Sequence, residues 1–370
     1  MNIVYPDYDR SVLSITNSIL THYGINPYHK TLPELDNIFE KNFRNIVFII
    51  FDGLGSGILE KHLDDSSFMH AHKSADISSV FPPTTTASTI AMHTGLSPIE
   101  HGWLGWRLYF KEIDMNVDVF PNIIGETKDT PAADYNVALK YIPYDNIFDK
   151  ISTHCKGVQA EFVAPFSEHR VNSIAEISET VRQICGLPGR HFLLTYWNNP
   201  DTDMHEHGTE SDIAHAIICD INQQIELLSE HLSDTVLIIT ADHGQIDTEY
   251  RYITDYPAIS ECLLRPQSIE SRAANFFVKP EKKEQFKTAF NRQFGNDFML
   301  LTKEQVLDRK LFGNGIPHKK VDDFIGDFLA IAVGNISIDH ARPTYRDVFI
   351  GQHAGLTEDE MTVPLIIIEK

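Results

Sequence analysis

The sequence predicts an α/β fold with a mostly parallel central sheet and helices on both of its faces. Four short apolar runs have the character of buried strands, and they cover residues 45–51, 191–197, 235–240 and 363–368. Helical patterns lie between these runs, and strands that alternate with helices are typical of a parallel, doubly wound sheet. Polar residues follow several of the runs, which indicates a site at one edge of the sheet.

The first predicted strand ends in a glycine-rich turn. Residues 45–51 read Asn-Ile-Val-Phe-Ile-Ile-Phe, and Asp52-Gly53-Leu54-Gly55 follows directly. A continuous apolar run without alternation indicates a strand that is buried on both faces. The turn therefore places Asp52 at the carboxyl end of a central strand.

Two prolines and a glycine delimit a predicted helix of about ten residues between Pro83 and Gly95. Three threonines, Thr84, Thr85 and Thr86, crowd its first turn. Backbone N–H groups are unpaired there and the helix dipole is positive, so this end of the helix favours a phosphate-like anion. The alternative interpretation is that these hydroxyls only cap the helix.

A second helix is predicted between the runs at 191–197 and 235–240. Its apolar positions Ile213, Ile217, Ile221, Ile225 and Leu228 are expected to form one face. Thr209 and Asp212 have the spacing of a capping pair at its start.

Residues 251–345 have a more polar character and predict a smaller inserted subdomain that lies over the site as a cap. Its expected helices cover 282–294 and 302–312, and its expected strands cover 275–278 and 327–333. The remaining residues, 1–250 and 346–370, would then form the core. The pattern of residues 105–190 predicts no fold.

The composition is that of a globular protein and restricts the partners. The chain has 370 residues, with 31 basic and 52 acidic residues and a formal net charge of −21. This charge disfavours duplex nucleic acid and anionic membranes as general partners. No apolar run approaches the ~20 residues of a membrane span, and the N-terminus lacks a signal-peptide pattern, so we expect a cytoplasmic protein without a membrane partner.

Metal-ligand side chains recur along the chain in an order that is hard to obtain by chance. Three aspartates stand at or near the carboxyl ends of apolar runs, where open α/β sheets bind their ligands. Histidines accompany them at adjacent or helical spacing, and carboxylates together with imidazoles suit Zn²⁺. A hydroxyl among such ligands suggests a metal-activated nucleophile. The full set is Asp52, Thr85, Asp201, His205, Asp242, His243 and His353.

These motifs resemble those of the alkaline phosphatase superfamily, and specifically its type I phosphodiesterase and nucleotide pyrophosphatase family. The matching segments flank the predicted insertion. They are Phe51-Asp52-Gly53, Phe81-Pro82-Pro83-Thr84-Thr85, Thr94-Gly95-Leu96-Ser97-Pro98 with Glu100-His101-Gly102, Asn199-Pro200-Asp201 with His205 and Gly208, Ala241-Asp242-His243-Gly244, and His353-Ala354-Gly355.

The resemblance implies an alkaline-phosphatase-like core with two zinc ions, or manganese in their place. One ion would be held by Asp201, His205 and His353, and the other by Asp52, Asp242 and His243. Thr85 would bind the second ion as the nucleophile, with Thr84 and Thr86 as alternatives. The implied activity is hydrolysis of a small-molecule phosphate ester or nucleotide through a phospho-threonine intermediate, above all as a phosphodiesterase or nucleotide pyrophosphatase.

The sequence departs from the family after the His101-Gly102 motif. Animal-type members carry an asparagine there that contacts the phosphate, whereas this chain continues Trp103-Leu104-Gly105-Trp106-Arg107. Arg107 is a candidate for bidentate phosphate binding, and a surface arginine is the alternative. A phosphomonoesterase and a phosphosugar mutase are the alternative functions within the superfamily, and a purely structural metal site is the alternative outside catalysis.

Overall fold

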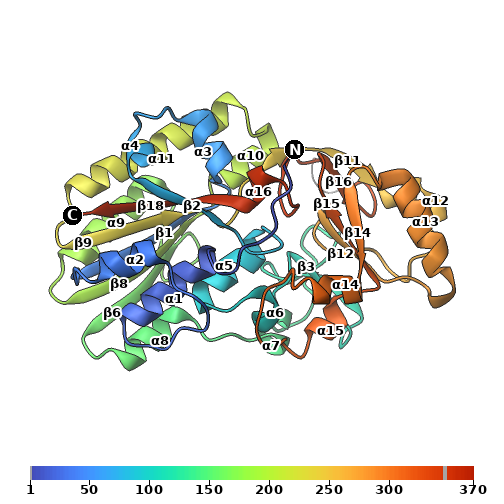
Figure 1. The fold of residues 1–370 in the computed structure, drawn as a ribbon, viewed down its shortest axis with the longest axis horizontal. Helices are drawn as coiled ribbons and strands as arrows, with labels where there is room; N and C mark the ends of the chain where they lie inside the picture. The colour runs from blue at the N-terminus through green and yellow to red at the C-terminus, as the bar shows by residue number, and fades with distance from the viewer. Residues whose placement is uncertain (1, 345–347) are drawn as a thin grey trace.

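The computed structural model describes residues 2–344 and 348–370 and shows a mixed α/β fold with a large central sheet. A second sheet stands beside the central one, and the two share a boundary on which many loops converge (Figure 1). Both sheets have seven strands.

The central sheet has the strand order β2-β18-β9-β1-β8-β6-β7. Strands β9, β1, β8, β6 and β7 pair in parallel, and β18 runs antiparallel to both of its neighbours. The strands are β1 (Asn45–Phe51), β2 (Lys73–Ser78), β6 (Val158–Ala164), β7 (His169–Arg170), β8 (Arg190–Trp197), β9 (Thr235–Thr240) and β18 (Thr362–Glu369).

The four apolar runs of the sequence are strands β1, β8, β9 and β18. All residues of β1 and β9 are buried, since helices cover both faces of the sheet. Strands β2 and β6 were not predicted, because exposed and half-buried residues interrupt them and leave no continuous apolar run.

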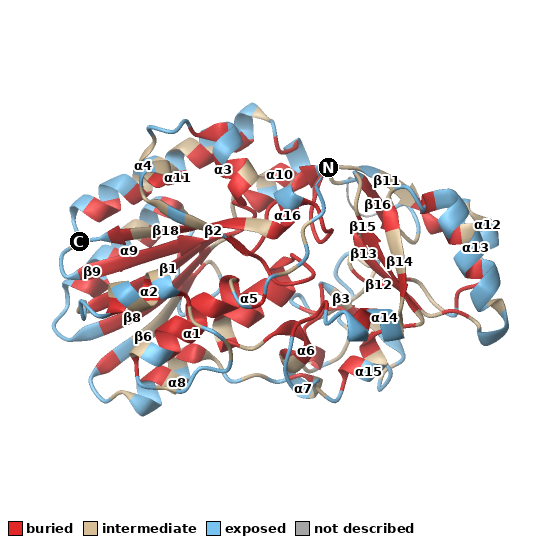
Figure 2. Cartoon of the chain, in the orientation of Figure 1, coloured by how far each residue is buried: buried red, intermediate tan, exposed pale blue. Residues whose placement is uncertain are grey.

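Helices cover the two faces of the central sheet and turn their buried sides toward it (Figures 1 and 2). One face carries α1 (Val12–His22), α2 (Pro33–Phe39), α5 (Thr85–Thr94) and α8 (Ile147–His154). The other carries α3 (Ser56–His62), α4 (Phe68–Ala71), α9 (Ile174–Gly186), α10 (Asp201–His207) and α11 (Asp212–Glu230). Within the described part of the chain, no helix is both long and apolar enough to cross a membrane.

Helix α11 differs from its prediction in face and cap. Its buried stripe includes Ala214 and Ile218, whereas Ile213 is exposed. The buried positions follow the 3.6-residue repeat of a helix, because they alternate steps of four and three residues: 214, 218, 221, 225 and 228. The predicted face began with successive steps of four residues, which do not follow this repeat. The N-cap is Ser211, whose hydroxyl accepts a hydrogen bond from the backbone N–H of Ala214.

The second sheet is antiparallel and has the order β14-β15-β13-β12-β3-β4-β5. It combines strands from two distant parts of the chain. They are β3 (Arg107–Phe110), β4 (Met115–Asp118) and β5 (Ile123–Ile124), followed by β12 (Ser268–Ile269), β13 (Ala273–Phe276), β14 (Phe298–Thr302) and β15 (Phe328–Ala332).

The predicted subdomain of residues 251–345 therefore shares its sheet with three strands that precede it in sequence. The division of the chain into that subdomain and a core of residues 1–250 and 346–370 stays a prediction. The boundary between residues 345 and 346 lies outside the described residues.

Both faces of the second sheet are covered. Along β15, Phe328, Ala330 and Ala332 face one apolar cluster, while Leu329 and Ile331 face the other, as the two-residue repeat of a strand requires. The surrounding helices are α6 (Pro98–His101), α7 (Val137–Tyr141), α12 (Pro257–Ser260), α13 (Lys283–Phe294), α14 (Lys303–Asp308) and α15 (Val321–Phe324), with 3₁₀ turns at Ile253–Asp255 and Pro280–Lys282.

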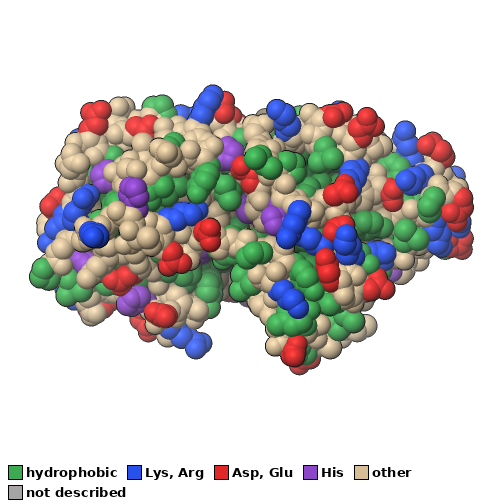
Figure 3. Space-filling model, turned by 90° about the horizontal axis from the view of Figure 1, so that it is seen from below, with side chains coloured by type: hydrophobic (Ala, Val, Ile, Leu, Met, Phe, Trp, Pro, Cys, Tyr) green, Lys and Arg blue, Asp and Glu red, His purple; other side chains and the backbone are tan. Residues whose placement is uncertain are grey.

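Two small sheets and one short helix complete the fold. Strand β10 (Ile246–Asp247) pairs with β17 (Gly351–Gln352), and β11 (Glu249–Tyr252) pairs with β16 (Ile336–Asp339). Helix α16 (Glu358–Met361) leads into β18. Acidic and basic side chains are interspersed over the face of the molecule shown in Figure 3.

A fully buried ion pair links the second sheet to the central one. Arg272, just before β13, contacts Glu360 of α16 through Nε–Oε1 (2.6 Å) and Nη2–Oε2 (2.7 Å). Arg272 also donates to the carbonyls of Ile336 and Gly334, and Glu360 accepts from the N–H of Gly355. Because every charged atom has partners, the pair holds the 353–355 loop at a fixed position.

Removing one charge of this pair should destabilise the fold. Glu360→Gln leaves the Arg272 guanidinium buried without its counter-ion, and we expect the free energy of unfolding to fall by about 3–5 kcal/mol. Denaturant unfolding measures the change, and Glu358→Gln, at an exposed position of the same helix, should change stability by less than about 0.5 kcal/mol. A loss below about 1 kcal/mol in Glu360→Gln would contradict this account.

Candidate active site

The three predicted aspartates meet at the carboxyl edge of the central sheet. Asp52 follows β1, Asp242 lies two residues after β9, and Asp201 begins α10 shortly after β8. Strand β1 lies between β9 and β8 and is parallel to both, so the ends of all three strands open on the same space. All three aspartates are buried.

A glycine permits the close approach of two of these segments. Gly53 has φ of +75°, a conformation that favours glycine, and a Cβ atom at this position would lie 2.8 Å from the Cβ of Asp201. The Asp52-Gly53 turn thus brings Asp52 against the start of α10.

The small sheet β10–β17 brings His353 to the site. Ile246 pairs with Gln352, so the residue after β17 lies near the Asp242-His243 turn that precedes β10. The carbonyl of Gly351 also accepts a hydrogen bond from Nδ1 of His205 (2.7 Å). His353 thereby comes close to His205 and His243, although more than 100 residues of sequence separate it from either of them.

The first group of ligands consists of Asp52, Asp242 and His243. Nε2 of His243 lies 3.2 Å from Oδ1 of Asp52 and 3.5 Å from Oδ2 of Asp242. The three side chains offer ligand atoms within 4.8 Å of one another. A group of this composition and spacing is a candidate for holding one metal ion.

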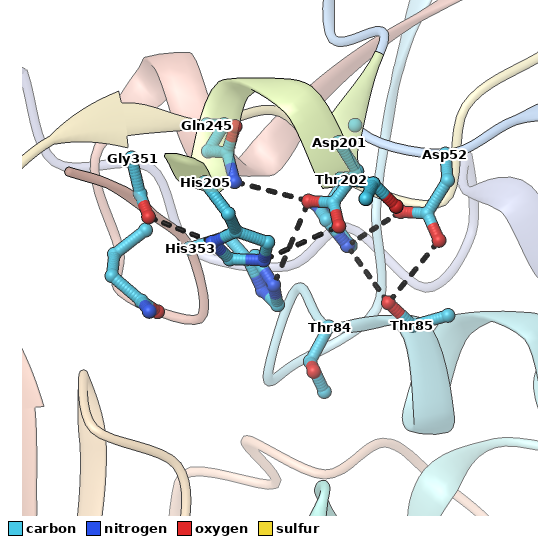
Figure 4. A network of polar contacts seen from close by, with 12 residues as sticks. Asp52, Thr84, Thr85, Asp201, Thr202, His205, Gln245, Gly351 and His353 are labelled. Atoms are coloured by element: carbon cyan, nitrogen blue, oxygen red, sulfur yellow. Dashed lines mark hydrogen bonds and ion pairs between the residues drawn. The ribbon is translucent and has the colours of Figure 1, made fainter. Parts of the chain in front are cut away.

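The second group surrounds Asp201. Its Oδ2 lies 3.2 Å from Nε2 of His205, and its Oδ1 lies 3.9 Å from Nε2 of His353. Asp201 and His353 also lie within 4.8 Å of a ligand atom of His243, whose ring stacks on that of His353 at 3.7 Å. The two groups are therefore neighbours, and Figure 4 shows Asp52 of the first group close to Asp201 of the second.

Thr85 is the threonine that faces the ligands. Its Oγ1 lies 3.4 Å from Oδ2 of Asp52 and 3.3 Å from Nε2 of His243 (Figure 4). Thr84 is the N-cap residue of α5, and its hydroxyl donates instead to Glu270 at 2.6 Å. The buried hydroxyl of Thr86 has no hydrogen-bond partner among the described residues.

Backbone carbonyls orient the imidazoles. Nδ1 of His243 contacts the carbonyl of Gly244 (3.0 Å), and Nδ1 of His353 contacts that of Pro83 (3.1 Å). With Nδ1 so engaged, Nε2 of each ring points to the carboxylates, which is how metal-binding histidines are commonly held.

Burial and mutual repulsion perturb the carboxylates. Burial, followed by repulsion from Asp201, raises the pKa of Asp52. Burial and the charge of Asp52 hold the pKa of Asp242 well above its usual range. Although burial alone would lower it, the carboxylates of Asp242 and Asp52 raise the pKa of His243 to about 10. The negative charges of these carboxylates are therefore concentrated at a buried position, where water solvates them poorly.

These residues fit a divalent cation. Oδ2 of Asp242 and Oδ1 of Asp52 are buried and accept no hydrogen bond from the described residues. The imidazole of His243 is an ion-pair partner of both oxygens, and a single imidazolium leaves negative charge on two buried carboxylates that a divalent cation would compensate. Mixed imidazole and carboxylate ligands with a nearby hydroxyl suit Zn²⁺, and Mn²⁺ is also compatible with them.

Arg107 lies apart from the ligands, although it lines the same cavity as Thr85. Its guanidinium makes a bidentate contact with Asp118 (2.6 and 3.1 Å) and lies 3.6 Å from Glu126. Its charge is therefore largely neutralised by protein carboxylates. Phosphate binding by Arg107 stays a prediction.

Three further residues support the site and were not predicted. The hydroxyl of Tyr196 donates to Oδ2 of Asp52, and Gln245 donates to Oδ1 of Asp201 (3.0 Å). Glu270, from the loop after β12, accepts from Thr84 and from the N–H of Trp106. Two of them carry a signal in the sequence: Tyr196 lies near the end of a predicted strand, and Gln245 closely follows the Asp242-His243 motif. Glu270 carries no such signal, because no recognised motif lies near it in the sequence.

Comparison with known proteins gives one family and several structural relatives. Residues 46–342 match the family model described as type I phosphodiesterase/nucleotide pyrophosphatase. Comparison with curated protein sequences gives no match.

The structural relatives include murine ectonucleotide pyrophosphatase/phosphodiesterase 5. It has 15% sequence identity and a TM-score of 0.65, and the alignment covers 86% of this chain and 87% of that one. Phosphonoacetate hydrolase from Sinorhizobium meliloti 1021, solved with phosphonoformate, has 15% identity and a TM-score of 0.64, with coverage of 87% and 89%.

Both relatives share the fold of this chain, and neither is named as a mutase, so the mutase alternative gains no support from them. The family model spans the segments that carry Asp52, Thr85, Asp201, His205, Asp242 and His243. Because the match extends over most of the sequence, this protein belongs to the type I phosphodiesterase/nucleotide pyrophosphatase family of phosphoric ester hydrolases.

Proposed function

We propose that the protein hydrolyses phosphodiesters of small molecules with two zinc ions and a covalent phospho-threonine intermediate at Thr85. The observation that carries this proposal is the position of the Thr85 hydroxyl, 3.4 Å from Asp52 and 3.3 Å from His243 at the start of α5. A hydroxyl within reach of a buried ligand group and at a helix N-terminus combines a nucleophile with a place for a phosphoryl anion.

Each group of ligands has a separate task in this proposal. Asp52, Asp242 and His243 would hold the ion beside Thr85, and Asp201, His205 and His353 would hold the other. A pair of divalent ions supplies positive charge that lowers the pKa of a hydroxyl and stabilises a departing oxygen. The imidazoles carry no negative charge, so the bound site keeps net positive charge for the substrate.

The residues account for both halves of the reaction. Oγ1 of Thr85 loses its proton to solvent and attacks phosphorus, and the bond from phosphorus to the departing alcohol oxygen breaks as that oxygen takes up a proton. Water then attacks phosphorus, the bond to Thr85 Oγ1 breaks, and the threonine hydroxyl is restored. The products are an alcohol and a phosphate monoester.

Two solved relatives hold small phosphorus-containing anions, and one of them bears on the choice of a phosphodiester. An inactive threonine-to-alanine variant of murine ectonucleotide pyrophosphatase/phosphodiesterase 5 was solved in complex with AMP. AMP is a phosphate monoester, the kind of product that the proposed reaction would release. The phosphonoacetate hydrolase structure contains phosphonoformate, a small anion that also carries a tetrahedral phosphorus.

Replacing Thr85 should remove the activity without unfolding the protein. We expect Thr85→Ala to lower kcat/KM for bis(p-nitrophenyl) phosphate by about a thousandfold or more, since the nucleophile is lost. Thr86→Val is the matched control, because the Thr86 hydroxyl has no partner among the described residues, and it should retain most activity. Undiminished turnover in Thr85→Ala would exclude the covalent mechanism.

Removing divalent metal should inactivate the protein and lower its melting temperature. A metal that binds only the folded state stabilises it, and the orphaned oxygens of Asp52 and Asp242 lose their compensation without it. Dialysis against a chelator followed by addition of zinc should reverse both effects, as measured by turnover and by thermal unfolding. In the Asp242→Asn variant, added zinc should restore less of the turnover and less of the melting temperature. Full activity after complete chelation would contradict the proposal.

A further inference from the structure

Two cavities open beside Thr85, and aspartates and glutamates outnumber lysines and arginines among the described residues that line each of them. The polar cavity has a volume of about 420 Å³ and is lined in part by Glu270, Arg107 and Gln352. The aromatic cavity has a volume of about 1020 Å³ and is lined in part by Phe148 and Phe162. Both cavities reach Thr85 and Trp106.

The aromatic cavity offers no cation from a lysine or arginine among the described residues that line it. The rings of Phe148 and Phe162 stack at 5.5 Å, and the ring of His93 meets both edge-on. The charged groups of its wall are mainly carboxylates, and the imidazole of His169 lies 2.7 Å from one of them, Glu161. Such a wall suits an apolar, aromatic or cationic group and repels an anionic one.

The polar cavity is also acidic apart from the candidate metal ligands. Its wall includes two basic residues, Arg107 and Lys128, and Arg107 is already paired with Asp118. Four carboxylates share the wall with them, those of Asp118, Glu206, Glu270 and Asp339. The Arg107–Asp118 pair is neutral as a whole and Asp339 has a contact of its own, so the comparison is between Lys128 on one side and Glu206 and Glu270 on the other. The two carboxylates outweigh the one lysine, and an additional negative charge on a substrate would meet net repulsion from this wall.

Glu270 is the acidic residue anchored beside the nucleophile segment. Its Oε1 accepts hydrogen bonds from Oγ1 of Thr84 (2.6 Å) and from the N–H of Trp106 (2.7 Å). Its Oε2 makes no hydrogen bond to the residues described, and the side chain lines the polar cavity. Thr84 directly precedes Thr85, so the carboxylate is held close to the position of the phosphoryl group.

We propose that the site selects phosphodiesters whose organic groups carry no negative charge, and that Glu270 is the specificity-determining residue. This inference rests on the proposed phosphodiesterase function. A phosphodiester has one negative charge near neutral pH, whereas a monoester has nearly two because its second pKa is about 6. Glu270 would repel the second charge, and the acidic walls of both cavities would repel further phosphates of a nucleotide polyphosphate.

The experiment compares substrates in matched variants at about pH 8, where the Glu270 carboxyl, whose pKa burial raises to about 7, is mostly ionised. The substrates are bis(p-nitrophenyl) phosphate, p-nitrophenyl phosphate and ATP. For the wild type, kcat/KM should be highest for the diester. Glu270→Gln should raise the ratio of monoester to diester kcat/KM by about tenfold, because one repelling charge is removed. Glu270→Asp, which keeps the charge, should retain the wild-type ratio.

Two other variants complete the test. Glu206→Gln, an exposed position on the wall of the polar cavity, should raise the ratio in the same direction by a smaller factor without risk to folding. Glu304→Gln, at an exposed position of α14 away from both cavities, should leave the ratio unchanged. A merely structural role of Glu270 would lower both rates equally and leave the ratio as it is.

An unchanged ratio in both Glu270→Gln and Glu206→Gln would overturn the inference, as would a wild-type preference for ATP or the monoester. The proposed function would survive either result as long as the diester is hydrolysed. A wild-type protein that hydrolyses no phosphodiester with zinc would instead overturn the proposed function itself.

Discussion

The burial of three aspartates in one space is the constraint on which the rest of the site depends. Asp52, Asp201 and Asp242 meet where three adjacent parallel strands end, and the sheet and its helices exclude water from them. The mutual repulsion of the three carboxylates is offset only if cations or hydrogen-bond donors surround them. The imidazoles supply part of this compensation, and Tyr196 and Gln245 supply hydrogen bonds. The carboxylate oxygens that accept no hydrogen bond, Oδ1 of Asp52 and Oδ2 of Asp242, mark where a divalent ion would bind.

The second sheet determines what can reach these ligands. It contributes Arg272, whose ion pair with Glu360 holds the loop of His353, and Glu270, which contacts the residue before Thr85. The same sheet supplies part of the wall of the polar cavity. In this account the central sheet provides the chemistry, whereas the second sheet provides the electrostatic conditions that distinguish one phosphate ester from another.

The sequence predicted the parts of the fold that local pattern encodes. Strands β1 and β9 were readable because every residue is buried, and α5 was readable because Pro83 and Gly95 delimit it. Strands β3 to β5 were missed, since they are short and carry no continuous apolar run, and since β3 joins them to the rest of the sheet only through its pairing with β12, far along the chain. Glu270 was missed for the same reason: its contact with Thr84 spans 186 residues, and no local pattern records it.

The most direct test of the account is the position of metal ions in crystals of the protein grown with zinc. Anomalous diffraction at the zinc absorption edge locates each ion independently of any assumed chemistry. We expect two peaks, one among Asp52, Asp242 and His243 next to Thr85, and one beside Asp201, His205 and His353. A single peak, or peaks away from these carboxylates, would contradict this expectation.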